Sequence, residues 1–187
     1  MSAGAVRVFE ATLRVLERRG PSALTMDNVA AEAGVTATAI YRHFANKDEL
    51  LKALIRDRYD VFLEYVSAAD TEGSARHVLI STFDRFLDFA FEHPHAYELL
   101  FVTPHGISID RYPDDFRSGK SRGFRQLKAL VAKGIDAGEI RDGDAADIAL
   151  DLYSHAHGLV LLHRAGRFGG RNDVMRRFFR RSLERFL

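Results

Sequence analysis

A short segment of the chain carries side chains suited to contact nucleic acid. Between Thr36 and Lys47 the residue pattern predicts a small helix whose inner face holds Ile40 and Phe44, four positions apart. The outer stripe of this helix then consists of small, polar and cationic residues, namely Ala37, Thr38, Tyr41 and Arg42, with His43 and Lys47 beside it. A slim helix with such a face can enter the major groove of DNA.

The residues before this helix predict a second helix and a tight turn. Thr25 is a candidate N-cap, because its hydroxyl can accept a hydrogen bond from an unpaired backbone amide. The apolar residues that follow recur at helical spacing and form one face: Met26, Val29, Ala30 and Ala33. Gly34 ends that helix, since glycine adopts the left-handed conformation at low cost, and Thr36 is a candidate cap of the next one. Together these features predict a helix-turn-helix.

A structural alternative to DNA binding stays open at this point. Corners of the helix–glycine–helix kind are common in all-α proteins, and a polar outer face is usually just solvated. The small residues favour nucleic acid, because Ala30, Ala33 and Gly34 let two helices cross closely. A surface helix that serves stability alone would more often carry Glu and Lys on its outer face.

Residues 9–55 resemble the N-terminal domain of the TetR family of bacterial repressors. The resemblance rests on Phe9-Glu-Ala, on Arg19-Gly20, on Leu24-Thr-Met-Asp-Asn-Val-Ala and above all on Ala39-Ile-Tyr-Arg-His-Phe-Ala-Asn-Lys-Asp-Glu-Leu-Leu51. It implies that each half of a dimer places residues 36–43 in a major groove, with Arg42 and Thr38 at base edges and Ala37 near a thymine methyl. The phosphate contacts that fix the register on DNA are then assigned to Thr25, Tyr41, His43 and Lys47.

Two of these phosphate contacts have structural alternatives. Tyr41 is either a phosphate ligand or a partly buried ring that supports the turn. His43 is either a phosphate ligand or a structural cap on the next corner of the chain.

The C-terminal half carries a second resemblance. Phe89-Ala-Phe-Glu-His-Pro-His-Ala-Tyr-Glu-Leu-Leu-Phe101 and His157-Gly-Leu-Val-Leu-Leu-His-Arg-Ala-Gly-Arg-Phe168 are similar to the TetR C-terminal domain named for a Trp-His-Gly triplet. Ala156 stands where that pattern has Trp, so the large indole ring is missing here.

Hydrophobic periodicity predicts an all-α protein, and no stretch of the sequence favours a strand. Besides the two short helices above, helices are expected at 3–19, 47–69, 75–92, 94–102, 116–137, 144–165 and 171–187. Residues 103–115 contain two prolines and a glycine, and we expect a mobile loop there. The predicted domains are a helix-turn-helix domain at 1–46, a connecting helix at 47–69 and a ligand-binding and dimerisation domain at 70–187.

Composition narrows the class of protein. The chain has 187 residues and no cysteine, so disulfides and thiol chemistry are excluded. No signal-peptide pattern is present and no apolar run approaches the roughly 18 residues of a membrane span, so we expect a soluble, cytoplasmic protein. The net charge is +1, but residues 164–187 are strongly basic. Four of their arginines either pair with the carboxylates of Asp144, Asp147 and Asp151 across a helix bundle, within one chain or between subunits, or bind nucleic acid or anionic lipid. These are Arg176, Arg177, Arg180 and Arg181.

An effector pocket is expected between the C-terminal helices. Its candidate lining is mostly aromatic, with a few polar groups, as is usual for small-molecule sites: Phe83, Phe86, Tyr97, Phe101, Phe124, Tyr153 and His157. The alternative for each ring is an ordinary core residue. We expect a small apolar effector and no cofactor. A metal site is not expected, because His155 and His157 point in different directions on a helix, and no motif predicts catalysis.

The helix at 144–165 is apolar on most of its circumference, so it needs a second partner for burial. With the final helix it is expected to form a four-helix interface about a two-fold axis, through Ile148, Leu152, Leu159, Met175, Phe179 and Leu183. The sequence thus predicts a ligand-responsive transcriptional repressor that binds a pseudo-palindromic operator as a homodimer. The alternative is a helical enzyme or small-molecule-binding protein that retains a helix-turn-helix fold without specific DNA binding.

Overall fold

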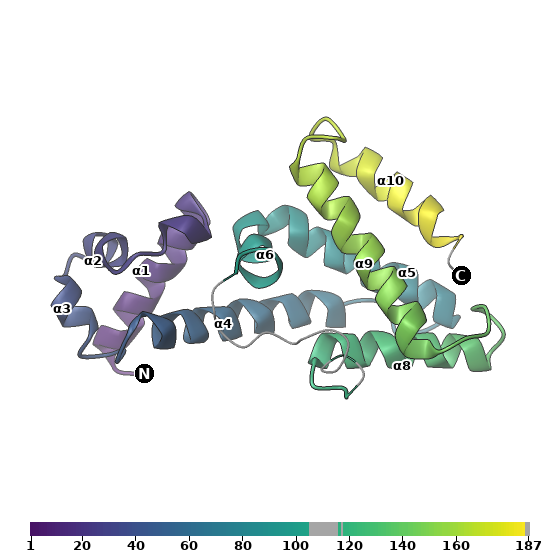
Figure 1. Ribbon diagram of the computed structural model, residues 1–187, viewed down its shortest axis with the longest axis horizontal. Helices are drawn as coiled ribbons and strands as arrows, with labels where there is room; N and C mark the ends of the chain where they lie inside the picture. The colour runs from purple at the N-terminus through teal and green to yellow at the C-terminus, as the bar shows by residue number, and fades with distance from the viewer. Residues whose placement is uncertain (105–115, 117, 186–187) are drawn as a thin grey trace. The chain divides into compact units, whose positions relative to one another are not determined.

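The structure, a computed structural model, describes residues 1–104, 116 and 118–185. Every regular element in these residues is a helix, which confirms the predicted all-α fold (Figure 1). The chain divides into two compact units. The first contains Met1–Phe62 and the segment that begins at Glu92 and includes the following helix. The second contains Leu63–Phe91 and the described residues from Phe116 onward.

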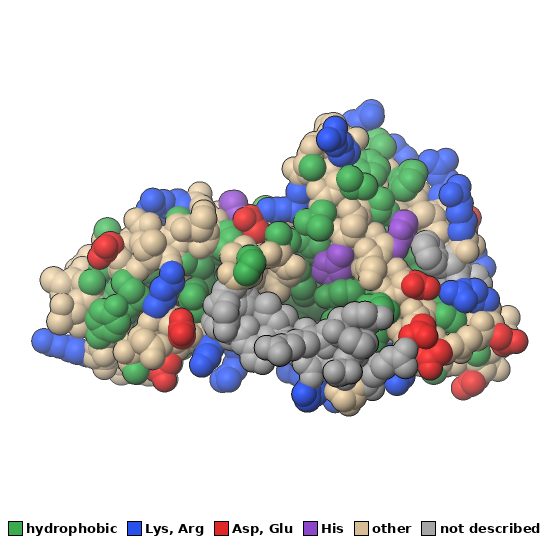
Figure 2. Space-filling model, in the orientation of Figure 1, with side chains coloured by type: hydrophobic (Ala, Val, Ile, Leu, Met, Phe, Trp, Pro, Cys, Tyr) green, Lys and Arg blue, Asp and Glu red, His purple; other side chains and the backbone are tan. Residues whose placement is uncertain are grey.

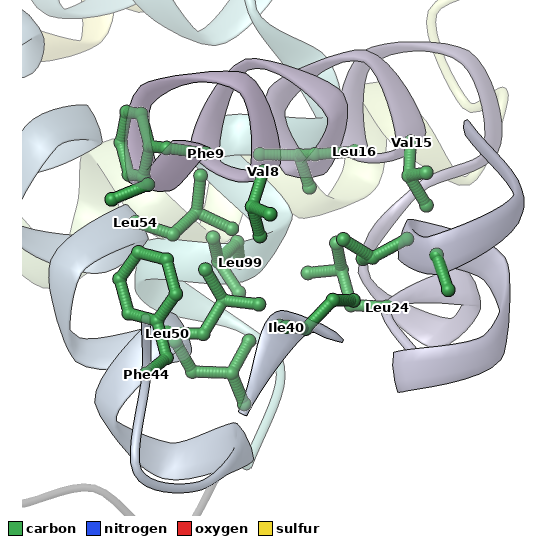
Figure 3. Packing of buried hydrophobic residues seen from close by; sticks show 14 residues of the cluster. Val8, Phe9, Val15, Leu16, Leu24, Ile40, Phe44, Leu50, Leu54 and Leu99 are labelled. Carbon is green, nitrogen blue, oxygen red and sulfur yellow. The ribbon is translucent and has the colours of Figure 1, made fainter. Parts of the chain in front are cut away.

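The first unit has one apolar core to which distant parts of the chain contribute. Helix α1 supplies a buried stripe with helical spacing, which includes Val8, Val15 and Leu16. Ile40 and Leu54 extend into the same cluster from two further helices (Figure 3). The helices of this unit are α1 (Ala3–Arg19), the 3-10 turn η1 (Pro21–Ala23), α2 (Met26–Ala33), α3 (Ala37–Ile40), the first part of α4 (Lys47–Ser67) and α6 (Pro94–Phe101).

Local hydrogen bonds fix the corner between α2 and α3 as the sequence predicts. The Thr25 hydroxyl accepts a hydrogen bond from the Asn28 amide at 3.2 Å. The Thr36 hydroxyl accepts one from the Ala39 amide, also at 3.2 Å. Between these caps, Gly34 ends α2 in the left-handed conformation, with φ 66° and ψ 37°. Both predicted caps and the predicted glycine turn are therefore confirmed.

Helix α6 packs with the first unit although it follows α5 in the chain. Leu99 is buried in the same core cluster as α1 (Figure 3). The imidazole of His95 lies against Gly20, where a Cβ would stand 3.0 Å from its Nδ1. This unit is larger than the domain predicted at 1–46, since it takes in part of α4 and all of α6. Apolar periodicity identifies a buried face of a helix, but not the partner that buries it.

The second unit contains the end of α4, α5 (Ala75–Glu92), α8 (Arg122–Asp136), α9 (Ala145–Arg164) and α10 (Asn172–Leu183). Helix α8 begins later than the predicted 116–137 helix, because Gly119 takes a φ of 75° and Ser121 is the N-cap residue. Helix α4 ends at Ser67 and α10 at Leu183, both short of the predicted ends. The loop predicted at 103–115 lies, from residue 105 on, outside the described residues.

Two arginines hold α10 against α5. Arg176 donates hydrogen bonds to the carboxylates of Asp84, at 3.2 Å, and of Asp88. Arg180 donates to the same Asp84 carboxylate through Nε, at 3.0 Å. Within the chain these arginines thus pair with α5 rather than with the aspartates of α9, which corrects the predicted pairing. Asp144 instead caps α9 by accepting hydrogen bonds from backbone amides.

The glycine turn generates a stability prediction. Gly34→Val is expected to destabilise the first unit by about 1–2 kcal/mol, because a β-branched residue must adopt the left-handed conformation. A Cβ at this position meets no atom within 4 Å, so the cost lies in the backbone and not in crowding. Gly34→Asn is the matched control, since asparagine tolerates positive φ better. Chemical denaturation measures both variants, and an equal loss of stability in the two would contradict this account.

Candidate nucleic-acid interface

Helix α3 and the turn after it form an exposed surface on the first unit. Ile40 and Phe44, 0% and 7% exposed, anchor this segment in the core. Between the two anchors the backbone stays in hydrogen-bonded turns, in which the His43 amide donates to the Ile40 carbonyl at 2.9 Å. The side chains on the other side are open to solvent. We call the eight predicted DNA contacts the recognition surface: Thr25, Thr36, Ala37, Thr38, Tyr41, Arg42, His43 and Lys47.

The structure places these residues in different settings. Thr25 and Thr36 use their hydroxyls as helix caps, and each hydroxyl retains a proton that it can donate to a phosphate. Tyr41 is 49% exposed, so its side chain is accessible to a phosphate, and the alternative of a partly buried ring that supports the turn stays open. Thr38, Arg42 and Lys47 are exposed, and Ala37 is half-buried. The His43 imidazole lies at the start of α1, with Nδ1 3.4 Å from the Ser2 hydroxyl oxygen.

An ion-pair cluster connects α1 with α2. The Glu32 carboxylate accepts a hydrogen bond from Arg14 Nε at 2.7 Å and lies 3.6 Å from Arg18 Nη1. The hydrogen bond from Arg14 is the main cause that lowers the pKa of Glu32 below its usual value, with a further contribution from the charge of Arg18. The exposed setting limits the strength of this pair, and it serves mainly to orient the two helices.

Five of the seven predicted effector residues lie together in the second unit. The rings of Phe86 and Tyr153 contact the imidazole of His157, with centroids 5.0 and 4.2 Å from it. The ring centroid of Phe124 lies 6.3 Å from that of Tyr153, and the ring centroid of Phe83 lies 6.3 Å from that of Phe86. Tyr153 and His157 come from α9, Phe124 comes from α8, and Phe83 and Phe86 come from α5. The group therefore connects three helices.

One aromatic residue of this group was not predicted from the sequence. Phe116 lies 4.7 Å from Phe124 and 5.7 Å from Tyr153, between ring centroids. It follows a stretch without helical periodicity, so no pattern indicated it. Tyr97 and Phe101, by contrast, lie in α6 of the first unit, where their rings are 5.2 Å apart. We call the six residues of the second unit the aromatic cluster: Phe83, Phe86, Phe116, Phe124, Tyr153 and His157.

Burial among these rings lowers the pKa of His157 to about 3, because the charged imidazolium loses its hydration there. The side chain is therefore neutral near pH 7, with one nitrogen that donates and one that accepts. His155 has other neighbours: its Nε2 lies 2.6 Å from the Ser182 hydroxyl oxygen, and its ring stacks on Phe179. The imidazoles of His155 and His157 thus have different neighbours, and they are not placed to bind one metal ion together.

Neither a metal site nor a membrane span emerges from the described part of the chain. Across residues 1–104, 116 and 118–185, no three His, Asp or Glu side chains gather in a way that would hold a metal ion. Within the same residues, no helix is long and apolar enough to cross a membrane.

The six residues predicted for the dimer interface are buried inside the second unit itself. Ile148, Leu152, Leu159, Met175, Phe179 and Leu183 all belong to its core. The ring of Phe179, for example, packs 5.4 Å from that of Phe83. This corrects their assignment to an interface. The exposed large apolar side chains of α9 and α10 are instead Leu161, Leu162 and Phe178.

Comparison with known proteins covers both units. Residues 8–54 match the bacterial regulatory proteins of the tetR family, and residues 79–186 match the tetracyclin repressor-like C-terminal domain. The chain belongs to the TetR family.

Two curated members of the TetR family illustrate the extent of the likeness. The transcriptional repressor KstR2 of Mycolicibacterium smegmatis is 26% identical over 136 residues, which are 72% of this chain and 64% of KstR2. The transcriptional regulator TtgR of Pseudomonas putida is 32% identical over 87 residues, which are 43% of this chain and 41% of TtgR. The match therefore spans less than two thirds of the length of either relative.

Solved structures share the TetR fold over almost the whole chain. A transcriptional regulator from Saccharomonospora viridis in complex with choline is 24% identical, with a TM-score of 0.76 over 98% of this chain and 97% of that one. FadR from Bacillus subtilis in complex with stearoyl-CoA is 14% identical, with a TM-score of 0.69 over 93% and 96% of the two chains. At these identities the likeness establishes the fold alone.

The buried histidine generates a pH prediction for this TetR family member. Unfolding returns the pKa of His157 from about 3 to its ordinary value of 6.5. Between these two values the unfolded chain binds a proton that the folded chain does not. Stability is therefore lost as the pH falls below 6.5, by up to about 1.4 kcal/mol for each pH unit.

Urea denaturation at pH 7.5 and at pH 5 measures this loss. His157→Phe is expected to reduce it, because the variant has no buried imidazole that gains a proton on unfolding. The account is wrong if His157→Phe loses as much stability on acidification as the wild-type protein.

Proposed function

We propose that the protein is a ligand-responsive transcriptional repressor, which binds a pseudo-palindromic operator as a homodimer and is released by a small apolar effector. The observation that carries the proposal is the doubly capped corner from Thr25 to Phe44. It holds α3 by two buried anchors and leaves a polar, cationic face open, in a segment that matches the tetR family. The relatives KstR2 and TtgR, a transcriptional repressor and a transcriptional regulator, support this function.

The recognition surface divides into base contacts and phosphate contacts in this proposal. Arg42 reads a base edge, since its guanidinium can donate two hydrogen bonds to guanine, and Thr38 and Ala37 contact neighbouring bases. Thr36 begins the segment that enters the groove. The side chains around these base-contacting residues bind the phosphates: Thr25, Tyr41, His43 and Lys47.

We place the dimer face on the exposed side of α9 and α10. Leu161, Leu162 and Phe178 are 45%, 47% and 43% exposed. Figure 2 shows hydrophobic side chains gathered over these two helices near the turn that joins them. Gly158 is exposed one turn before the leucines, and a Cβ there would meet no atom within 4 Å. Such a glycine lets a second helix approach closely, and a two-fold axis would bring the same patch of two copies together.

The aromatic cluster is the proposed effector site. Its rings are apolar, while Tyr153 and the neutral His157 supply hydrogen-bonding groups, as is usual for small-molecule sites. Regulators of this fold were solved in complex with choline and with stearoyl-CoA, which supports a small-molecule effector here. Helix α4 contributes residues to both units and is the proposed route of coupling. The effector releases the operator only if it binds the off-DNA state better.

We also propose that the C-terminal unit is of the Trp-His-Gly type, with Ala156 in the place of Trp. Ala156 is buried, His157 contacts the aromatic cluster and Gly158 is exposed, so three successive residues serve the core, the effector site and the dimer face. The relatives are regulators, which supports a protein without catalytic activity. The alternative, a helical enzyme or small-molecule-binding protein that keeps the fold without specific DNA binding, makes a different prediction for DNA.

Selection of bound fragments from random duplexes separates these two functions. Enrichment of an inverted repeat, with half-sites about 34 Å or a multiple of it apart, would support the repressor. Bound fragments that share no sequence would support the alternative, a protein without specific DNA binding.

The selected duplex then tests the base contact. Arg42→Ala is expected to lose about 1–3 kcal/mol of preference at one base position in each half-site. Lys47→Ala, the matched control among the exposed cations of this surface, is expected to weaken binding at all sequences alike and to flatten its salt dependence. Binding measured against single-base variants at two salt concentrations distinguishes them. Unchanged base preference in Arg42→Ala would remove this residue from the base-reading set.

The dimer face predicts a change in oligomeric state without loss of fold. Leu161→Asp and Phe178→Asp are expected to give monomers that keep their helix content, because both side chains are exposed within one chain. Leu159→Asp is the matched contrast: its side chain is buried, and the variant is expected to unfold the second unit. Sedimentation and circular dichroism measure the two effects. A wild-type protein that sediments as a monomer at micromolar concentration would rule out this face.

A further inference from the structure

Gly4 occupies the first turn of α1, where the backbone gives no reason for glycine. Its φ does not fall in the left-handed region, unlike that of Gly34. A glycine within a helix is less stable than an alanine, because it loses more conformational freedom on folding. The helix therefore starts with a residue that favours it less than alanine would, and the space left by the missing Cβ is taken by a neighbouring side chain.

The imidazole of His43 fills the space that a side chain on Gly4 would take. A Cβ on Gly4 would stand 2.5 Å from Nε2 and 2.7 Å from Cε1 of that ring, closer than such atoms can approach. The other ring nitrogen, Nδ1, lies 3.4 Å from the hydroxyl oxygen of Ser2. The same hydroxyl caps α1 by accepting a hydrogen bond from the Ala5 amide at 3.3 Å. In Figure 1 the N-terminus lies beside the turn between α3 and α4.

His43 lies in the turn after α3, between the buried anchors Ile40 and Phe44. The backbone amide of His43 donates a hydrogen bond to the Ile40 carbonyl, which fixes the backbone but not the direction of the side chain. An exposed side chain that must be immobilised on binding costs affinity, and a contact that holds it beforehand removes part of that cost.

We propose that Ser2 and Gly4 position His43 for its contact with a DNA phosphate, so that the first turn of α1 is part of the DNA-binding machinery. This role rests on the proposed function, because it presupposes an operator. Gly4 provides the room for the imidazole and Ser2 provides a polar partner at its edge. Both are positioning residues, and neither need touch DNA itself.

Gly4→Ala tests the role with the addition of one carbon. The close contact is with the end of a flexible side chain, so the imidazole is displaced while α1 remains intact. Because alanine favours helix, the thermal midpoint is expected to be unchanged or higher. Affinity for the selected duplex is expected to fall about threefold to tenfold, in the range of one lost hydrogen bond. The proton NMR signals of the His43 ring are expected to shift even without DNA.

Two further variants make the test specific. In a His43→Ala background, Gly4→Ala is expected to have no additional effect on affinity. Ala3→Val enlarges an exposed residue on the same turn and is expected to leave both affinity and the His43 signals unchanged.

The outcomes separate this role from the proposed function. If His43→Ala lowers affinity and Gly4→Ala does not, the phosphate contact stands and the positioning role is overturned. If the His43 signals stay in place in Gly4→Ala, the contact between ring and helix is refuted whatever the DNA result. If the wild-type protein selects no duplex sequence, the proposed function and this role both fall.

Discussion

The recognition surface depends on the burial of two side chains. Helix α3 has four residues, far fewer than an isolated helix needs in water. Its direction is therefore set by Ile40 and Phe44, which are held in the core that α1 provides, and by the cap at Thr36. The polar residues of the recognition surface alternate with these anchors along the same short segment. Any change that loosens the core beneath α3 thus also displaces the recognition surface.

Local rules were sufficient to predict this part of the molecule. The caps at Thr25 and Thr36 each depend on an amide three residues away, and the turn at Gly34 depends on the conformation of one residue. Helical spacing predicted that Ile40 and Phe44 are buried, although the helix is shorter than expected: α3 ends at Ile40 and Phe44 follows it in a turn. The family could be identified from the same segment, because its motif residues are those that cap, anchor and expose the corner. Which of them touch bases or phosphates stays a prediction.

Contacts between distant parts of the chain could not be predicted in this way. Periodicity indicated that Leu159 is buried, but not that the core of its own unit buries it, and no local pattern predicted that Leu99 joins the core of α1. The pairing of Arg176 with Asp84 spans 92 positions, and charge spacing favoured nearer aspartates on α9. A helix with apolar residues on most sides has two buried faces, and the sequence does not distinguish the chain's own core from a partner. The room for His43 above Gly4 likewise depends on two segments that meet only in the folded state.

Helix α4 shows how an effector could act on the operator contact in the proposed repressor. Leu50, Leu51 and Leu54 are buried in the first unit, so this part of α4 moves with α1 as one body, since close-packed cores do not deform continuously. Further along α4, Tyr65 packs edge-on against Phe89 of α5 at 5.6 Å. Helix α5 also carries Phe86 of the aromatic cluster.

An effector in the aromatic cluster is therefore connected to α4 through α5 and the contact between Phe89 and Tyr65. This connection alone does not release the protein from its operator. To shift the protein from one state almost entirely to the other, the effector must bind the favoured state about 10⁴-fold more tightly. A molecule that fills the same aromatic surface equally well in both states would bind tightly and leave the operator occupied. The discriminating contacts are thus those that change when α5 moves, and Phe83 and Phe86 are the cluster residues that share this helix with Phe89.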